Sequence, residues 1–221
     1  MLRKTIGVAL GLIVAGHTLL PMPSQAQVSA KHLAKEALQE CDQGRAKKVR
    51  EARLMHFQTG QALAEQAVSL DERYADAHFS LFCNLGEILR IDGESIAATF
   101  GFRRMMNELD RTLELNPGHL DALSAKGTFL VKLPGVLGGN KEKGEQLLQQ
   151  VVKRAPQAIN ARLALAKVRC ERGRHQEAVT LASDALAIAR KHKRAEFIPE
   201  ARATLQQLRT NATTASYKPP L

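Results

Sequence analysis

The sequence predicts an all-α protein, a right-handed α-solenoid of about four helical hairpins followed by one C-terminal capping helix. Apolar residues recur at helical spacing through almost the whole chain after its first 26 residues. Pro117 and Pro156 each end a periodic segment, and the hairpins around them are too small to bury their own apolar faces, so stacking is expected. Aromatic residues make up only 4% of the 221 residues and Trp is absent, which fits helices packed through Ala and Leu.

The first 26 residues are typical of a secretory signal peptide. Arg3 and Lys4 precede an apolar run over 6–20, and Ser24-Gln25-Ala26 provides small residues for cleavage. An uncleaved membrane anchor is the alternative, but the run is shorter than the roughly 20 residues of a membrane span and prolines follow it. Since no Cys lies at the cleavage site, a lipoprotein anchor is not expected. We therefore expect an exported chain, periplasmic or secreted, with no stable transmembrane anchor.

The repeat domain is expected over 27–209, and its first hairpin begins with a capped helix. Ser29 can cap a helix that runs to Asp42, and Gly44 ends it. A longer apolar pattern over 47–70 provides the second helix of this hairpin.

The second hairpin is expected over 75–91 and 95–115, with a turn between them. Phe82 and Met105 stand where the two helices should touch, but they lie further apart in the sequence than a regular hairpin allows. Both helices are therefore expected to be longer than usual.

The third hairpin begins with a helix over 120–132, in which Gly127 holds a small-residue position. A loop over 133–140 follows, and Asn140 is the expected N-cap of the next helix, which Pro156 stops. The third hairpin is thus close to regular except for the insertion in its turn.

The fourth hairpin covers 159–190 and has the most regular pattern. A final helix is expected over 196–208 because Pro199 is tolerated only in a first turn, and this helix would cover the open end of the array. The polar segment 210–221 ends in Lys-Pro-Pro-Leu and is expected to be a flexible tail.

The fourth hairpin resembles a tetratricopeptide repeat, a helical hairpin of about 34 residues. Ala166, Ala178 and Ala185 occupy the small-residue positions at which its two helices approach, and Gly173 occupies the turn. The resemblance implies a protein-interaction module.

The wider stretch 45–190 is similar to a divergent branch of tetratricopeptide proteins. It carries LELNP, then DALSAKG, then LPGVLGGNKEKGEQLL. That branch includes the T component of tetratricopeptide-associated TRAP transporters and the regulator-of-microtubule-dynamics proteins.

The resemblance also implies a concave groove lined by the first helix of each hairpin. The residues at the positions that usually face it are mostly polar, with a few apolar ones. They are Asp76, Phe79 and Cys83 in the second hairpin, Asp121, Ser124 and Thr128 in the third, and Asn160, Leu163, Lys167 and Cys170 in the fourth. For each of them, a groove face that binds nothing specific is the alternative.

Positive charge is concentrated in the C-terminal half. Of the 30 basic and 22 acidic residues that follow the signal peptide, 15 basic and 7 acidic ones lie in 141–210. Two basic patches are expected at opposite ends of the last hairpin's second helix: Arg169, Arg172 and Arg174, and Arg190, Lys191, Lys193 and Arg194. An exported chain with this charge favours an acidic protein or an anionic envelope component over nucleic acid. A solvated helix surface without a partner is the alternative.

No catalytic, metal or cofactor site is predicted, so an enzyme is not expected. The histidines lie on separate elements, most of them expected at the surface or in turns, and no Cys lies beside a plausible base in the sequence. The glycine-rich loop over 135–141 does not fit a phosphate-binding loop, because Asn140 stands five positions after Gly135 and Glu142, not Ser or Thr, follows Lys141. It is expected to be a turn between helices, with a binding loop at the rim as the alternative. Cys41 and Cys83 could form a disulfide, or all three cysteines could be small packing residues.

The function predicted is that of an exported scaffold that binds an extended peptide or a partner helix in its groove, with basic side chains speeding the encounter with an acidic partner. A transporter accessory component, which would hold a small organic ligand or dock a solute-binding protein, is the alternative.

Overall fold

The computed structural model describes residues 29–92 and 96–216, so the predicted signal peptide lies outside the described residues. Within these ranges the chain forms nine α-helices, two short 3-10 helices and no strand, which confirms the all-α prediction. The helices are α1 (Ala30–Ala46), α2 (Arg50–Leu70), α3 (Ala75–Asp92), α4 (Ile96–Leu115), α5 (Leu120–Lys132), α6 (Lys141–Arg154), α7 (Ile159–Glu171), α8 (His175–Lys191) and α9 (Ile198–Ser216), with η1 (Gly135–Leu137) and η2 (Ala195–Phe197) between them. None of the described helices is long and apolar enough to span a membrane.

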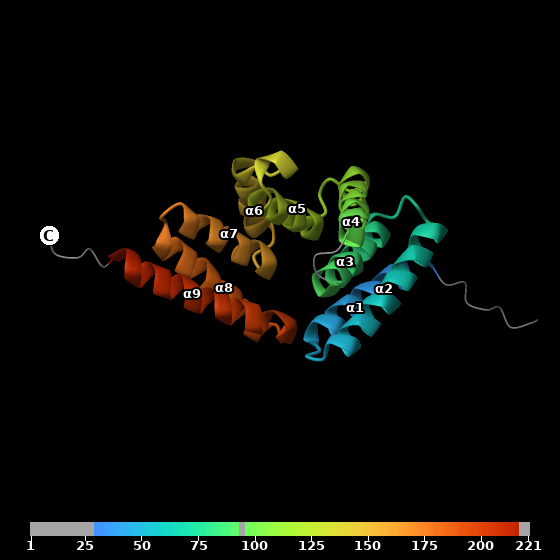
Figure 1. Cartoon of the computed structure of the whole chain (residues 1–221), viewed down its shortest axis with the longest axis horizontal. Coiled ribbons are helices and arrows are strands. Elements are labelled where there is room, and N and C mark those ends of the chain that lie inside the picture. The colour runs from blue at the N-terminus through green and yellow to red at the C-terminus, as the bar shows by residue number, and fades with distance from the viewer. Residues whose placement is uncertain (1–28, 93–95, 217–221) are drawn as a thin grey trace, which may run out of the picture.

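The eight helices α1–α8 form four antiparallel hairpins, and α9 packs against α8 as the predicted cap (Figure 1). Several apolar clusters follow one another along the array; three of them join neighbouring hairpins, and the fourth joins the last hairpin to α9. The core is thus built mainly from contacts between successive units, as in a solenoid stabilised by nearest-neighbour packing.

Polar caps fix several helix starts where the sequence placed them. The Ser29 hydroxyl accepts a hydrogen bond from the backbone N–H of His32, and the Asn140 side chain accepts one from Lys143. The start of α5 is capped by His119, whose Nδ1 accepts from the N–H of Ala122. These bonds satisfy donors that the first turn of a helix leaves unpaired.

The small residues of the fourth hairpin pack as the repeat register predicts. Ala166 on α7 and Ala178 and Ala185 on α8 are all fully buried. Gly173 lies in the turn with φ 73°, a left-handed conformation that other L-residues adopt at a cost. The close approach of α7 and α8 therefore depends on the absence of larger side chains.

In the third hairpin the two helices approach each other through a pair of facing glycines. A Cβ added to Gly144 would lie 2.8 Å from the Gly127 carbonyl oxygen, and one added to Gly127 would lie 3.1 Å from the Gly144 oxygen. The backbones of α5 and α6 are thus nearly in contact, which explains why Gly144 stands where a repeat usually has Ala.

The second hairpin is longer, as expected, with 18 residues in α3 and 20 in α4. Its contact positions hold Phe82 and Met105, which are 8% and 3% exposed. Large side chains thus fill the contact between α3 and α4, where the third hairpin has glycines.

The capping helix is longer than predicted, because α9 continues to Ser216 instead of ending before Thr210. The hydroxyls of Thr210 and Thr213 donate back to the carbonyls of Gln206 and Arg209, so polar side chains continue the helix rather than interrupt it. The predicted tail start at 210 is therefore wrong, and 217–221 lie outside the described residues.

The two ends of the array approach each other, which the sequence did not predict. The start of α9 and the short η2 lie beside the C-terminal end of α1 at the base of the arch (Figure 1). Arg194 Nη2 lies 3.6 Å from Asp42 Oδ2 across this contact. The concave side is therefore enclosed by the first hairpin as well as by the other three.

Candidate functional site: a central cavity

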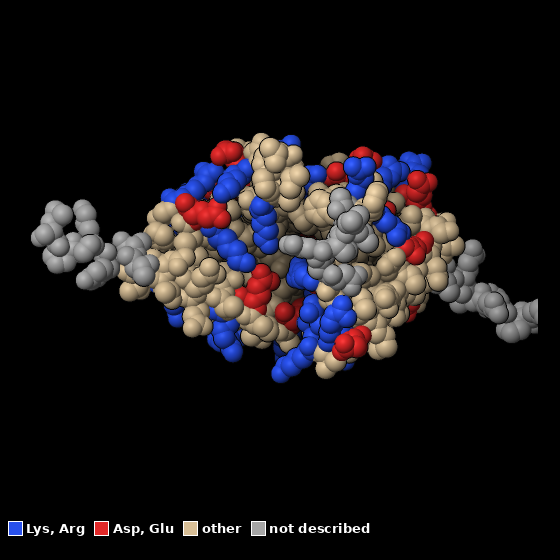
Figure 2. Space-filling model, viewed as in Figure 1, with Lys and Arg blue, Asp and Glu red and all other residues tan. Residues whose placement is uncertain are grey.

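A cavity of about 860 Å³ occupies the concave side of the arch. Its walls come from α1, α2, α3, α4, α5 and α7, and η2 with the start of α9 closes its base. Figure 2 shows basic and acidic side chains intermingled around the central hollow of this face. The site is thus shared by all the hairpins rather than built by one repeat.

Most of the residues predicted to face the groove meet in this cavity. The lining includes Phe79, Cys83, Asp121, Ser124, Thr128, Asn160, Leu163 and Lys167. Their place on one concave wall follows from the repeat register, whereas their role in binding stays a prediction.

Asp76 and Cys170 do not line the cavity. Asp76 accepts a hydrogen bond from Tyr74 and lies 3.2 Å from His119, so it ties the start of α3 to the turn before α5. Cys170, at the far end of α7, lies instead against His175 and Asn211. Both predicted groove positions are wrong because they fall at helix ends, beyond the part of the concave wall that the curvature brings together.

One part of the cavity wall is aromatic. The rings of Phe79 and Phe82 lie 5.7 Å apart, and Phe129 meets both Phe82 and Phe102 edge-on at 6.2 and 5.9 Å. Such a wall can bury an apolar side chain of a ligand.

Glu87 forms the polar part of the wall. It lies on α3 one helical turn after Cys83, whereas the aromatic residue Phe79 lies one turn before it. The Glu87 side chain is 2% exposed, and its Oε1 accepts from Arg45 Nε at 2.8 Å. Arg53 Nη2 lies 3.7 Å from Oε2, yet Oε2 and Arg53 Nε are both buried without a hydrogen-bond partner among the described protein atoms. A buried polar atom without a hydrogen-bond partner costs about 1–3 kcal/mol, so this ion-pair cluster is incompletely satisfied.

The α5–α7 side of the cavity carries a group of cations. Burial lowers the pKa of Lys132, and repulsion from Lys167 and Arg90 lowers it further, against an opposing effect of Glu200. Lys167 lies 3.3 Å from Glu200 at the start of α9. A bound anion would relieve the repulsion around Lys132.

The sequence contained a usable signal for two of these residues. Glu87 and Lys132 follow the groove residues Cys83 and Thr128 by one helical turn, so extending the groove register by four residues would have found them. Arg45 and Arg53 come from the first hairpin, whose part in the cavity depends on the curvature of the whole array.

The first predicted basic patch is an ion-pair network rather than a free surface. Arg169 is 9% exposed and lies 2.5 Å from Glu145 of α6, while Arg172 reaches the other oxygen of the same carboxylate at 3.0 Å. Arg174 pairs with Glu177 at 2.6 Å. The prediction of a basic patch is wrong here because Glu145 of α6 and Glu177 of α8 neutralise these arginines.

The second patch is partly neutralised. Arg194 pairs with Glu196 and reaches Asp42, and its guanidinium stacks over the Phe197 ring at 4.9 Å. Arg190, Lys191 and Lys193 remain exposed around the turn after α8. The C-terminal half thus presents less unpaired positive charge than its composition suggests.

Three histidines are more buried than expected and pair with carboxylates. His78 on α3 is 5% exposed and lies 2.6 Å from Glu108 on α4, and His56 on α2 lies 2.7 Å from Glu40 on α1. The third, His119, is the α5 cap. His78 and His56 each join the two helices of a hairpin and none of the three lines the cavity, so their geometry indicates a structural role.

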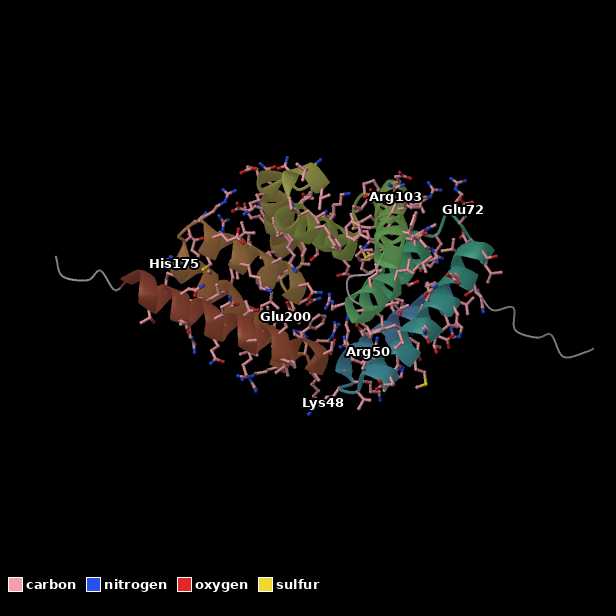
Figure 3. The ribbon with its side chains drawn as sticks, viewed as in Figure 1. Lys48, Arg50, Glu72, Arg103, His175 and Glu200 are labelled. Atoms are coloured by element: carbon pink, nitrogen blue, oxygen red, sulfur yellow. The ribbon has the colours of Figure 1, made fainter. Side chains whose placement is uncertain are left out.

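Cys170 lies beside a base, contrary to the sequence-based expectation. Its sulfur is 3.5 Å from His175 Nδ1 and accepts from Asn211 Nδ2 at 3.7 Å. A catalytic cysteine needs its histidine oriented by a third group, whereas Asn211 is bonded to the sulfur, and His175 lies far from the cavity at the outer end of the α7–α8 hairpin (Figure 3). Within the described ranges no group of three or more His, Cys, Asp or Glu could hold a metal ion.

Comparison with known proteins gives matches among solved structures. No protein-family model and no curated protein sequence matches the chain. The structure is similar to TTC0263, a thermophilic TPR protein of Thermus thermophilus, with a TM-score of 0.50 and 17% identity over 80% of this chain and 100% of that one.

Two further solved structures are less similar. MamA (41-end) from Desulfovibrio magneticus RS-1 has a TM-score of 0.44 and 14% identity, covering 82% of this chain and 92% of that one. YrrB, a TPR protein with an unusual peptide-binding site, has a TM-score of 0.33 and 14% identity, covering 76% of this chain and 99% of that one. The comparison with TTC0263 confirms the tetratricopeptide-like fold, and the transporter-associated branch stays a prediction.

Proposed function

Given a tetratricopeptide-like solenoid, we propose that this protein is an exported interaction scaffold that binds a peptide segment of a partner protein in its central cavity. The observation that carries the proposal is the convergence of eight predicted groove residues on one cavity of about 860 Å³. This volume lies in the range of ligand sites, about 300–1,000 Å³, and accommodates a short segment rather than a whole helix.

The chemistry of the walls specifies the segment. The four phenylalanines would take an apolar or aromatic side chain, and the cations around Lys132 would take an acidic one. We therefore propose a segment that combines an acidic residue with a large apolar residue.

The test is a selection of peptides from a random library on the chain that begins at Gln27. Selected peptides should be enriched in that combination and should bind Lys132→Glu at least tenfold more weakly, a change of about 1.4 kcal/mol. Lys153→Glu is the matched control, because Lys153 is exposed on α6, makes the same charge change and does not line the cavity. Unchanged binding to Lys132→Glu would overturn the proposal.

Electrostatic steering is a separate part of the proposal. Because interactions between exposed charges are screened over about 8–10 Å at physiological salt, raising the ionic strength should slow association of an acidic peptide. An affinity independent of salt would contradict electrostatic steering, but it would not contradict the cavity as the binding site. A pull-down from envelope extract, comparing the wild type with Lys132→Glu, would then identify the natural partner.

Export would be tested on the N-terminus of the purified protein. We expect expression of the full chain in a bacterial host to give a product that starts at Gln27 and fractionates with the periplasm. A product that keeps residues 1–26 would contradict export by cleavage.

A transporter accessory role is the second candidate, because a cavity of this volume also fits a small organic ligand. Its walls carry charged side chains beside the aromatic ones, which favours an organic acid over an apolar compound. Native mass spectrometry of the freshly purified protein would reveal a retained small molecule, and its absence together with peptide binding would favour the scaffold.

A further inference from the structure

Two cysteines from different hairpins meet at the cavity wall. Cys41 on α1 is fully buried, whereas Cys83 on α3 is 8% exposed and lines the cavity. Both are free thiols in the same buried cluster, where α1 packs on α3, and each side chain shifts the pKa of the other. Cys83 faces the cavity, whereas Cys41 does not line it.

A charged neighbour distinguishes the two thiols. Arg45 Nη2 donates to Cys83 Sγ at 3.6 Å, and the same side chain donates through Nε to Glu87. The hydrogen bond from Cys41 and then the charge of Arg45 lower the pKa of Cys83, against burial and the charge of Glu87. The hydrogen bond to Cys83 and burial raise the pKa of Cys41. Cys83 is thus the thiol that ionises first.

The backbone around the pair is fixed by a buried amide. Asn84, next to Cys83, donates from Nδ2 to the carbonyl of Ala37 at 3.0 Å and to that of Ser80 at 2.9 Å. Ala37 lies one turn before Cys41 on α1. This bond holds α1 against α3 at the level of the two sulfurs, so the thiols meet in a defined register.

We propose that Cys83 and Cys41 form a peroxide-sensitive dithiol, in which Cys83 reacts with a peroxide that enters the cavity and Cys41 resolves the product to a disulfide between α1 and α3. The Cys83 thiolate attacks one oxygen of hydrogen peroxide, the O–O bond breaks, and hydroxide departs to leave a sulfenic acid on Cys83. Cys41 sulfur then attacks Cys83 sulfur, the S–O bond breaks, and the hydroxide leaves with the Cys41 proton as water. Two thiols and one peroxide thus give one disulfide and two waters, with two electrons passing from sulfur to oxygen.

Cys170 offers an internal contrast. It lies beside His175 at the outer end of the α7–α8 hairpin, and among the described residues it is a free cysteine without a second thiol beside it. Oxidation of Cys170 would stop at the sulfenic acid or give a disulfide between two molecules. The intramolecular disulfide is therefore specific to the cavity pair.

Oxidation would also change the cavity. The thiolate next to Arg45 would be lost, which leaves Glu87 and Asp42 as the acidic partners of that arginine, and the new bond would cross-link the first hairpin to the second. These two hairpins carry Arg45, Arg53 and Arg90 of the wall.

The first test treats the full chain with hydrogen peroxide, blocks remaining thiols and maps the peptides by mass spectrometry. We expect a Cys41–Cys83 linked peptide in the wild type and in Cys170→Ser. Cys41→Ser should instead give a sulfenic acid on Cys83 that dimedone traps. Absence of the linked peptide from the wild type would overturn the proposal, and this result does not depend on the folding of any variant.

The second test measures the role of Arg45 from the alkylation rate of Cys83 near neutral pH in a Cys170→Ser background. Arg45→Gln should lower the rate about tenfold, because a loss of one pKa unit of stabilisation lowers the thiolate fraction by that factor. Arg45→Lys should retain most of the rate. Equal rates in Arg45→Gln and the parent would show that the arginine does not activate Cys83, and the order of attack would then be wrong.

Discussion

The two halves of the molecule each bury a glutamate among arginines, yet the two clusters differ in how well they are satisfied. Both oxygens of Glu145 are paired, one with Arg169 and the other with Arg172. Glu87 pairs with Arg45 through one oxygen, while its other oxygen and Arg53 Nε lack hydrogen-bond partners among the described protein atoms.

The two clusters also differ in where they lie relative to the cavity. The Glu145 cluster joins α6 to α7 away from the cavity and places an arginine at each carboxylate oxygen, so it links the third hairpin to the fourth. The Glu87 cluster lines the cavity and leaves two buried polar atoms without hydrogen-bond partners. The incompletely satisfied cluster therefore lies at the proposed binding site, and the satisfied one lies away from it.

The largest expected effect is on the satisfied cluster. Glu145→Gln should lower the free energy of unfolding by about 3 kcal/mol, because it leaves the buried guanidinium of Arg169 without its principal counter-ion. Urea denaturation measures it. Glu142→Gln is the control, since Glu142 is exposed and should change stability by less than about 0.5 kcal/mol. Similar effects of the two substitutions would mean that Arg169 is not buried in solution.

The next effect tests helix contact in the regular and the expanded hairpin. Ala178→Leu should destabilise the protein by about 1–3 kcal/mol, because α7 and α8 approach through fully buried alanines. Met105→Leu, at the corresponding position of the second hairpin, keeps the side-chain volume and should cost less than about 1.5 kcal/mol. Calorimetric melting compares them, and a neutral Ala178→Leu would disprove the repeat register.

Glu87→Gln should affect stability less than Glu145→Gln and should affect ligand binding more. We expect a loss of about 1–2 kcal/mol in stability, smaller than for Glu145→Gln, because Arg45 and Arg53 are more exposed than Arg169. Titration of a selected cavity peptide into this variant should show altered affinity, whereas Glu145→Gln should bind normally below its melting transition. Normal binding by Glu87→Gln would exclude the cluster from the site.

The smallest effects concern two turns of the same shape. Gly173 after α7 has φ 73° and Lys193 after α8 has φ 54°. Gly173→Ala should cost about 1 kcal/mol, since its Cβ would meet no neighbour and only the backbone is strained. Lys193→Gly should stabilise by about 0.5 kcal/mol, because the same strain is removed. Thermal melts of both variants check the opposite signs.

Much of the fold could be predicted from local pattern. The start of α5, its end, and the start of α7 match the predicted residues, and Ser29 and Asn140 cap the helices that they were expected to cap. These features depend on neighbours three or four residues apart, which the sequence displays directly. The extension of α9 past Thr210 was missed because threonines that bond to the preceding turn look the same in the sequence as those of a polar tail.

The candidate site could be predicted only in part, on the first helices of hairpins two to four. Repeat register placed Phe79, Ser124 and Leu163 on one concave wall, and the structure brings them together. It could not show that the first hairpin contributes arginines to the same cavity, or that Arg169 and Arg172 are neutralised by Glu145. Those contacts depend on partners from other hairpins, for which the local pattern carries no signal.

The sequence by itself determined a helical-hairpin array, its register and the close helix contacts at its alanines and glycines, because each of these follows from residues within one hairpin. Only the tertiary structure decided that the array curves far enough for Arg194 to meet Asp42, which encloses a charged cavity. Curvature accumulates from small rotations between successive hairpins, and these depend on the packing of whole interfaces rather than on any one residue.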